Sequence, residues 1–344
     1  MSAYNLIENA PLDARSSFRV SARAELLADL RQPQALGELL ALPWLRDKPV
    51  LTLGEGSNLL FAGDVDGLVL SLANQGIRIL ERDGERVLIR AEAGERWDDL
   101  VRWSVAQGLH GLENLALIPG SVGAAPIQNI GAYGAEAGEF IRSVEAFDRH
   151  AGRIVRLDHG TCAFGYRDSL FKRQPERWII TALELELDRS RPFRLDYAGV
   201  RETLAEFGDA PLRPSLIAEA ISRLRSRKLP NPMLLGNAGS FFKNPLVDQA
   251  RAAELARDFP GLPLHGGDTG QVKVSAAWLI EHCGWKGFRD GDAGVAAQHA
   301  LVLVNHGQAS GRQILDLARR IADSVRERFA IDLEPEPRIV GATW

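Results

Sequence analysis

The chain has 344 residues, which is more than one hydrophobic core usually spans, so two or three domains are expected. Hydrophobic residues make up 45% and charged residues 25%, proportions that are typical of globular proteins and argue against long disorder. The net charge of −4 gives no general attraction to nucleic acid or to anionic membranes, so we expect neither as a partner.

The start of the chain and its cysteines indicate a compartment. The first ten residues lack the apolar stretch of a signal peptide, and no apolar run is long enough to span a bilayer. Cys162 and Cys283 form neither a CxxC pair nor a cluster with metal-ligand spacing, so we expect no metal site. Two isolated thiols are typical of a reducing environment. We therefore expect a cytoplasmic protein.

The first half of the chain contains mostly strand-like segments. An apolar run at 50–53 stops at Gly54 and predicts a buried strand, and 87–91 predicts another. The apolar spacing of 97–107 predicts a helix, with Gly108 following its C-terminus. Further strands are expected at 144–147, 154–157 and 178–187.

The composition changes between residues 190 and 215, where proline-containing polar segments replace the apolar runs. Beyond this break, helices are expected at 215–229, 248–259, 276–283 and 310–329, and Ser215 is in a position to cap the first of them. Strands are expected at 300–305 and 338–340. The fold class that these elements predict is α+β.

Two glycine-rich segments are candidate ligand-binding loops. The first, Gly54-Glu55-Gly56-Ser57-Asn58, follows a predicted strand directly and could turn N–H groups toward an anion. It is not the Rossmann fingerprint, because Leu59 stands where the third glycine would be, and a plain strand-exit turn explains it at least as well.

The second glycine-rich segment, residues 118–134, combines glycines and alanines with few charges. Small residues allow a backbone to approach a large flat ligand, and tight packing between two elements is the alternative. Polar Ser121, Gln128 and Asn129 favour a ligand, because buried polar groups need partners. No Walker motif, GxSxG elbow or HExxH pattern accompanies the two segments, which argues against an NTPase, a serine hydrolase and a zinc hydrolase.

Two basic motifs have both a structural and a functional interpretation. The segment 166–172 mixes aromatic and basic residues and is either a solvated loop or part of a site. Arg225, Arg227 and Lys228 end a predicted helix, where cations suit the helix dipole. The alternative is a small basic cluster for a diphosphate.

Ser240 and two glutamates are the candidates for proton chemistry. Ser240 has no base beside it in Gly236 to Pro245, so it is a poor nucleophile. It could either donate a proton to a developing carbanion or satisfy a turn. Glu334 and Glu336 would face one side of a strand, as a charged edge or as catalytic carboxylates.

These motifs occur together and in order, and in this combination the chain resembles the UDP-N-acetylenolpyruvoylglucosamine reductase family in its longer, type I form. The resemblance runs from about Ser17 to Trp344. It implies a vanillyl-alcohol-oxidase-like FAD-binding fold of two subdomains plus a C-terminal α+β substrate-binding domain. The implied boundaries are 1–70 and 71–210 for the subdomains, 211–330 for the substrate-binding domain and 331–344 for a C-terminal strand returning to the active site.

The resemblance also implies an activity, which is NADPH-dependent reduction of the enolpyruvyl group of UDP-N-acetylglucosamine enolpyruvate to UDP-N-acetylmuramate in peptidoglycan precursor synthesis. FAD would be bound non-covalently, NADPH would be the co-substrate, and the protein would be a monomer. The family's catalytic positions match Arg167, Ser240 and Glu336. Arg167 would stabilise the developing negative charge, Glu336 would orient the substrate carboxylate, and Ser240 would protonate carbon.

The family's ligand-binding positions can be carried over residue by residue. Those that hold FAD match Gly54, Glu55, Gly56, Ser57, Asn58, Pro119, Gly120, Ser121, Gly123, Ala124, Gln128, Asn129, Gly131 and Tyr133. Those that hold the UDP end match Tyr197 on a mobile lid, Lys228 and Asn244. The family often has a glutamine just before the strand at 300, where this chain has His299 preceded by Gln298, and either side chain could make that contact.

Three other functions fit parts of the pattern. An oxidase of the same fold often holds flavin covalently through His or Cys, but no histidine lies in either glycine-rich segment. A nucleotide-sugar-binding protein without catalysis would not need Arg167, Ser240 and Glu336 together. A hydrolase using Glu334 and Glu336 is disfavoured, because carboxylates on one strand do not flank a scissile bond well.

Overall fold

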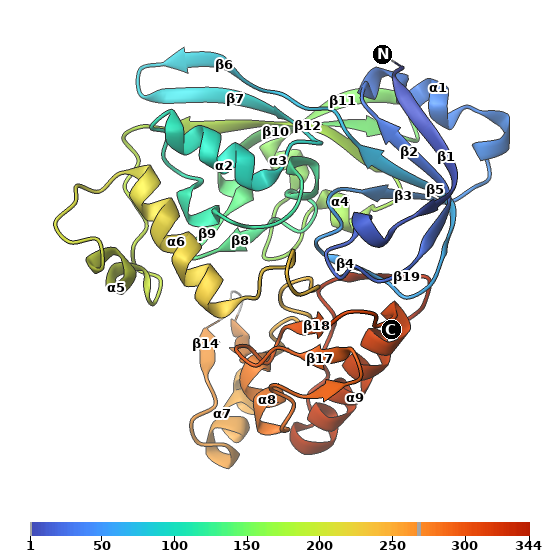
Figure 1. Cartoon of the computed structure of the whole chain (residues 1–344). Helices are drawn as coiled ribbons and strands as arrows, with labels where there is room; N and C mark the ends of the chain where they lie inside the picture. Colours follow the sequence, from blue (N-terminus) through green and yellow to red (C-terminus); the bar gives the residue numbers. More distant parts are fainter. Residues whose placement is uncertain (1, 267–269) are drawn as a thin grey trace. The chain divides into compact units, whose positions relative to one another are not determined.

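The chain folds into two compact units, each assembled from separated pieces of the sequence. A computed structural model describes residues 2–266 and 270–344 (Figure 1). The first unit contains the chain up to Ala10, Ala24–Glu55 and Asp66–Arg227. The second unit contains Pro11–Arg23, Gly56–Val65 and Lys228–Trp344. One division between the units therefore falls inside the loop at 54–58.

Two sheets form the framework of the first unit. One has the strand order β1-β2-β5-β3, and the other has the order β11-β10-β12-β7-β6 and is antiparallel throughout. Their strands are β1 (Tyr4–Pro11), β2 (Arg23–Leu30), β3 (Val50–Leu53), β5 (Val65–Leu72), β6 (Ile77–Asp83), β7 (Arg86–Glu92), β10 (Ile141–Asp148), β11 (Arg153–Asp158) and β12 (Trp178–Asp188). A short pair, β8 (Gly131–Ala132) and β9 (Ala135–Glu136), lies at the end of the second glycine-rich segment.

One face of the five-stranded sheet is apolar and is covered by helices, because alternate residues of a strand point to the same side. In β7, Val87, Ile89 and Ala91 are buried and share a core with Trp97 of α2 and Ile221 of α6. The helices of the first unit are α1 (Leu36–Leu40), α2 (Trp97–Ala106), α3 (His159–Cys162), α4 (Leu170–Arg173), α5 (Val200–Ala205) and α6 (Pro214–Lys228).

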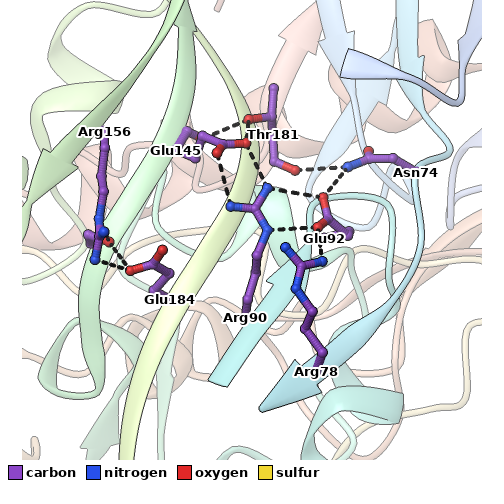
Figure 2. Close-up of polar contacts among 9 residues, drawn as sticks. Asn74, Arg78, Arg90, Glu92, Glu145, Arg156, Thr181 and Glu184 are labelled. Carbon is purple, nitrogen blue, oxygen red and sulfur yellow. Dashed lines mark hydrogen bonds and ion pairs between the residues drawn. The ribbon is translucent and has the colours of Figure 1, made fainter. Parts of the chain in front are cut away.

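The opposite face of this sheet carries a network of charged side chains (Figure 2). The Arg90 guanidinium donates to both carboxylate oxygens of Glu145, at 2.7 and 2.9 Å, and pairs with Glu92 at 2.8 Å. Thr181 Oγ1 donates to Glu145 (2.9 Å), and Asn74 Nδ2 donates to Glu92 (3.0 Å). The network joins β7, β10 and β12 through side chains that alternate with those of the apolar face.

Where the structure describes it, the second unit consists of small sheets and of helices that follow them along the chain. Its parallel pair joins β4 (Leu59–Phe61) to β19 (Arg338–Val340). The other sheets have the orders β13-β15-β14 and β16-β17-β18. Their strands are β13 (Leu246–Val247), β14 (Leu264–Gly266), β15 (Val272–Val274), β16 (Arg289–Asp290), β17 (Ala293–Val295) and β18 (Leu303–Asn305). The helices are α7 (Gln249–Asp258), α8 (Ala276–His282) and α9 (Gly311–Phe329).

Most of the predicted elements are confirmed, and two boundaries are corrected. The strand expected at 300–305 is limited to 303–305, because the Val302 N–H donates to the His299 carbonyl (3.0 Å) in a turn. The helix expected from Ser215 begins one residue earlier, at Pro214. Proline suits a first helical turn because its missing N–H would have no partner there, so Ser215 is not the cap.

Candidate active site

Gly54 and Glu55, the part of the first glycine-rich segment that belongs to the first unit, lie against the second glycine-rich segment. The Glu55 carboxylate accepts a hydrogen bond from the Gly120 N–H (2.9 Å) and pairs with Arg96 (2.8 Å). A Cβ atom at Gly54 would lie only 2.3 Å from Ser121 Oγ, so the backbone there leaves no room for a side chain. Glu55 therefore joins the two segments, which the sequence pattern did not indicate.

Close packing accounts for two other glycines of these segments. Gly56 has a φ of +64°, and a Cβ atom there would lie 2.0 Å from the Arg15 carbonyl oxygen. At Gly123 a Cβ atom would lie 2.7 Å from that of Ala93, whose carbonyl accepts the Gly123 N–H at 2.9 Å. Both observations support the packing interpretation, which is compatible with a ligand on the open side. Pro119 is exposed, and Ser57, Ala124 and Gln128 are half-buried.

Asn129 and Arg167 connect the second glycine-rich segment to the loop after α3. Asn129 is buried, accepts the Gly138 N–H (2.7 Å) and donates to the Gly165 carbonyl (3.1 Å). The Arg167 guanidinium donates to the Gly131 carbonyl at 2.9 Å. Asn129 and Arg167 have φ values of +45° and +53°. Such strain at non-glycine residues clusters at functional sites.

Tyr133 and Tyr197 pack against each other in the first unit. Their rings meet edge to face with centroids 5.1 Å apart, and Tyr197 is 46% exposed whereas Tyr133 is buried. Asn114 Nδ2 donates to the Tyr133 carbonyl (2.8 Å) and to the Arg194 carbonyl (3.0 Å), which ties the two chain segments together. Burial raises the pKa of Tyr133, so its hydroxyl is neutral at physiological pH.

Ser240 lies in an extended segment of the second unit, between two others. On one side it bridges to Val302, and the Phe241 N–H donates to the Leu301 carbonyl (2.7 Å). On the other side the Glu336 N–H donates to the Phe241 carbonyl (2.8 Å). The fold of the second unit therefore brings the Ser240 and Glu336 segments into register, although almost 100 residues separate them in the sequence.

The turn that precedes Ser240 is satisfied by Asn237. Its Oδ1 accepts the Gly239 N–H (2.9 Å), and its Nδ2 donates to the Leu235 carbonyl (2.7 Å). Over residues 2–266 and 270–344, the Ser240 hydroxyl forms no hydrogen bond, and the side chain is half-buried. A turn-capping role therefore does not account for Ser240.

Glu334 and Glu336 occupy different environments. Glu334 is exposed and forms an ion pair with Lys243 at 2.8 Å. Glu336 is half-buried, and its carbonyl accepts a hydrogen bond of 3.4 Å from Asn58 Nδ2 of the first glycine-rich segment. The Asn58 carbonyl in turn accepts the Arg338 N–H (3.0 Å). The two glutamates therefore do not act as a matched acid/base pair, which removes the basis of the hydrolase alternative.

The predicted UDP-binding residues of the second unit include a neutral histidine. His299 Nδ1 accepts the Leu301 N–H (3.2 Å), so Nε2 carries the ring proton. Burial first, and the positive charge of Lys228 second, lower the pKa of His299. His299 is half-buried and Gln298 is exposed. Asn244 Oδ1 accepts the Ala276 N–H (3.0 Å) at the start of α8.

Neither the cysteines nor the acidic and histidine side chains form a second site within the described residues. Cys162 and Cys283 are free thiols, and burial raises the pKa of Cys162 to about 12. In the parts of the chain that the structure describes, no three His, Cys, Asp or Glu side chains are gathered as metal ligands. None of the helices in these parts has the length and apolar character needed to cross a membrane.

Comparisons with known proteins agree with one another over nearly the whole chain. Residues 24–158 match an FAD binding domain family, and residues 231–340 match the family of UDP-N-acetylenolpyruvoylglucosamine reductase C-terminal domains. The chain is 56% identical over 342 residues to the UDP-N-acetylenolpyruvoylglucosamine reductase of Xanthomonas oryzae pv. oryzae (strain PXO99A), covering 99% of this chain and 98% of the relative. The reductase of Xanthomonas campestris pv. campestris (strain 8004) is 53% identical with the same coverage.

A solved structure supports the same fold. The crystal structure of the UDP-N-acetylenolpyruvylglucosamine reductase from Thermus caldophilus matches with a TM-score of 0.67 and 26% sequence identity, covering 98% of each chain. The expected fold class is confirmed: the chain is α+β, with a vanillyl-alcohol-oxidase-like FAD-binding fold and a C-terminal domain of the reductase type.

Proposed function

Because the chain belongs to the UDP-N-acetylenolpyruvoylglucosamine reductase family, we propose that Arg167, Ser240 and Glu336 carry out its reaction. The protein is an FAD-dependent oxidoreductase that reduces the enolpyruvyl group of UDP-N-acetylglucosamine enolpyruvate to give UDP-N-acetylmuramate in peptidoglycan synthesis. NADPH is the reductant. The observation that carries the assignment of residues is the register between the Ser240 and Glu336 segments. The Ser240 hydroxyl, moreover, forms no hydrogen bond with any residue that the structure describes.

The two glycine-rich segments fit a bound FAD. The close approach of Gly54 to the Ser121 side chain, together with the hydrogen bond from the Gly120 N–H to Glu55, places the backbones of the two segments side by side as one surface. Such a surface suits a pyrophosphate and a flat ring system. We assign FAD contacts to Gly54–Asn58 and to the segment 118–134. When bound, FAD carries hydride from NADPH to the enolpyruvyl group.

Arg167 is suited to stabilise negative charge next to the reacting carbon. Its guanidinium is positively charged at any physiological pH and is oriented by the Gly131 carbonyl. A fixed cation in a closed site stabilises an enolate-like charge more strongly than it stabilises the neutral substrate. The Arg167 backbone has a φ of +53°, and the hydrogen bond to the Gly131 carbonyl holds the guanidinium against the glycine-rich segment, which fits this role.

Ser240 supplies the proton that completes the reduction at C2 of the enolpyruvyl group. A hydroxyl that already donated inside the protein would be less available, and no such bond is formed within the described ranges. Glu336, fixed on the adjacent segment through the Phe241 carbonyl, orients the substrate carboxylate. The two residues therefore act on the same end of the substrate.

The UDP end is held by Tyr197, Lys228, Asn244 and His299. The supporting observation for His299 over Gln298 is its half-buried position close to the charge of Lys228. As a neutral imidazole with a proton on Nε2, it donates a hydrogen bond much as a glutamine amide does. Tyr197 is exposed and packs on Tyr133, as a lid residue would.

Lys228→Ala tests the diphosphate contact. We expect the KM for the UDP-sugar to rise roughly 10- to 100-fold, because a charge-assisted hydrogen bond contributes about 1.5–3 kcal/mol. Steady-state kinetics with each substrate varied in turn measure this effect. Lys286→Ala is the control, since Lys286 also acts on His299 but is paired with Glu281 (2.9 Å). An unchanged KM for Lys228→Ala would mean that Lys228 does not bind the diphosphate and only interacts favourably with the C-terminal end of its helix.

The proposed function as a whole is tested on the purified protein. It should be yellow, lose its colour with NADPH and regain it when UDP-N-acetylglucosamine enolpyruvate is added. Heat or acid denaturation should release the flavin into the supernatant, because no attachment residue lies in the glycine-rich segments. Flavin that stays with the precipitated protein would instead favour a covalent oxidase of the same fold.

Three further expectations belong to the same proposal. The protein acts as a monomer in the cytoplasm, with no nucleic acid or membrane partner. Residues 1–70 and 71–210 form the two FAD-binding subdomains, and 211–330 form the substrate-binding domain. Residues 331–344 return to the active site, which the pairing of the Glu336 segment with residues 241–243 supports.

A further inference from the structure

Asn237, three residues before Ser240, has a polar side chain but is almost fully buried, with 3% of its surface exposed. Its Nδ2 donates to the Leu235 carbonyl (2.7 Å) and to the Pro230 carbonyl (3.2 Å), and its Oδ1 accepts the Gly239 N–H (2.9 Å). The amide therefore makes three hydrogen bonds inside one loop. The last of them fixes the residue that directly precedes the proposed proton donor.

The backbone of Asn237 links this loop to the first glycine-rich segment. The Asn237 N–H donates to the Ser17 carbonyl (3.0 Å), and the Ser17 N–H donates to the Gly56 carbonyl (3.1 Å). Ser17, Gly56 and Asn237 all belong to the second unit, although they are far apart in the sequence. A continuous series of hydrogen bonds therefore runs from the proposed FAD-binding loop, through Ser17 and Asn237, to the turn before Ser240.

A second buried asparagine supports the same contact between segments. Asn305 is 4% exposed, its Nδ2 donates to the Phe18 carbonyl (3.0 Å), and its N–H donates to the Gly236 carbonyl (2.8 Å). A Cβ atom at Gly236 would lie 2.5 Å from the Phe18 carbonyl oxygen, so the two segments touch through their backbones. Asn305 therefore fixes where the segments meet, whereas Asn237 extends the contact to the turn before Ser240.

We infer that Asn237 is a positioning residue, which places the Ser240 hydroxyl relative to the FAD-binding loop. The inference rests on the proposed function, in which Ser240 protonates the carbon next to the one that receives hydride. A general acid has to come within about 2.6–3.2 Å of the atom that it protonates, and a misplacement of about 1 Å can cost on the order of 100-fold in rate. Asn237 acts on the reaction through Ser240, because its side chain holds the turn from which Ser240 extends.

Asn237→Ala tests the inference. Reoxidation of the reduced flavin by the UDP-sugar should slow roughly 10- to 100-fold, because the serine hydroxyl is no longer held where proton transfer needs it. Flavin reduction by NADPH should stay within about 2-fold of wild type, since that half-reaction needs no proton at carbon. The solvent deuterium isotope effect on reoxidation should rise, because protonation then limits the rate. Stopped-flow absorbance of the flavin in H₂O and in D₂O measures all three quantities.

Two further variants and a control separate positioning from a loss of stability. Asn237→Ser should recover part of the reoxidation rate, because a serine hydroxyl can accept the Gly239 N–H, though more weakly than the asparagine amide. In a Ser240→Ala background, Asn237→Ala should cause no further slowing, because Asn237 acts through Ser240. Asn231→Ala is the matched control, since Asn231 is exposed and its Oδ1 accepts the Met233 N–H (2.9 Å) in the same loop. Both half-reactions should stay within about 2-fold of wild type in this control.

The inference is overturned if Asn237→Ala slows the two half-reactions equally, leaves reoxidation unchanged, or slows reoxidation further when Ser240 is already alanine. The same slowing of reoxidation in Asn231→Ala would also overturn it. If Asn237→Ala does not fold, Asn237→Ser is judged by the same pattern, which is slower reoxidation with normal reduction. The proposed function is checked separately, by reduction of the wild-type protein with NADPH, by its reoxidation with the UDP-sugar, and by the slower reoxidation of Ser240→Ala alone.

Discussion

Replacing Ser240 with alanine should leave flavin reduction by NADPH near normal and should slow reoxidation by the UDP-sugar roughly 10²- to 10⁴-fold. The first half-reaction needs no proton at carbon, whereas the second ends with protonation of C2, and loss of a general acid typically costs this factor. Stopped-flow absorbance of the flavin measures the two half-reactions separately. Ser240→Cys should retain more of the second half-reaction than Ser240→Ala, because a thiol can still donate a proton.

Ser275→Ala is the matched control for Ser240→Ala. Ser275 lies in the same unit and accepts the Trp278 N–H (3.3 Å) as the N-cap of α8. Its loss should cost about 1 kcal/mol of stability and change neither half-reaction. If Ser240→Ala slows both half-reactions equally, Ser240 shapes the flavin pocket instead, and the proton must come from Glu336 or from water.

Arg90→Met should destabilise the first unit by about 3 kcal/mol, because it removes the cation that Glu92 and Glu145 share and leaves Glu92 only the exposed Arg78. The side chains of Arg90 and Glu92 are each only 14% exposed, and that of Glu145 is 26% exposed, so water replaces the lost contacts poorly. Urea unfolding of the flavin-saturated protein measures the free energy of unfolding. Figure 2 shows that Arg90 is the cation that contacts both Glu92 and Glu145.

Arg78→Met is the control for Arg90→Met, because it removes one positive charge from the same sheet face without removing the cation that bridges Glu92 and Glu145. Arg78 donates to the same Glu92 (3.3 Å) but is 60% exposed, so its loss should cost less than about 1 kcal/mol. Equal losses of stability in Arg90→Met and Arg78→Met would contradict the argument.

Hydrogen bonding from Arg90 lowers the pKa of Glu145 below its ordinary value of 4.5. The stability from this pair is therefore full above pH 4.5 and is lost as the pH falls through the lowered pKa, so the deficit of Arg90→Met should shrink in acid.

Local patterns predicted many, but not all, of the elements that have a regular buried face, and the buried strands β2 and β5 were not among the expected strands. The strands at 50–53 and 338–340 have the predicted bounds, and α9 has the expected apolar stripe, with Ser310 and Gln313 forming a capping box. The edge strands β1 and β6 were missed, because most of their side chains are exposed and the alternation that begins at Ile77 and Ile79 of β6 does not continue to the end of the strand. The two-residue strands β13 and β16 are too short to produce a period.

The sequence indicated the residues of the candidate site but not how they are brought together. The family resemblance pointed to Ser240 and Glu336, but their adjacency depends on pairing between distant segments, which periodicity cannot reveal. The resemblance assigned Glu55 to the FAD-binding loop, but no pattern in the sequence indicated that its carboxylate would accept a hydrogen bond from the Gly120 N–H.

The parallel pairing of β19 with β4 has a consequence for how the chain folds as it is made. Its two strands lie near opposite ends of the sequence, so the pair can form only after Val340 has left the ribosome. The five-stranded sheet, by contrast, is complete once residue 188 has emerged. At a synthesis rate of about 5–20 residues per second, the sheet of the first unit therefore has several seconds to form before the second unit can close. During that interval β4 has no partner on the side that β19 later occupies, and this is the period in which the nascent chain most needs protection from aggregation.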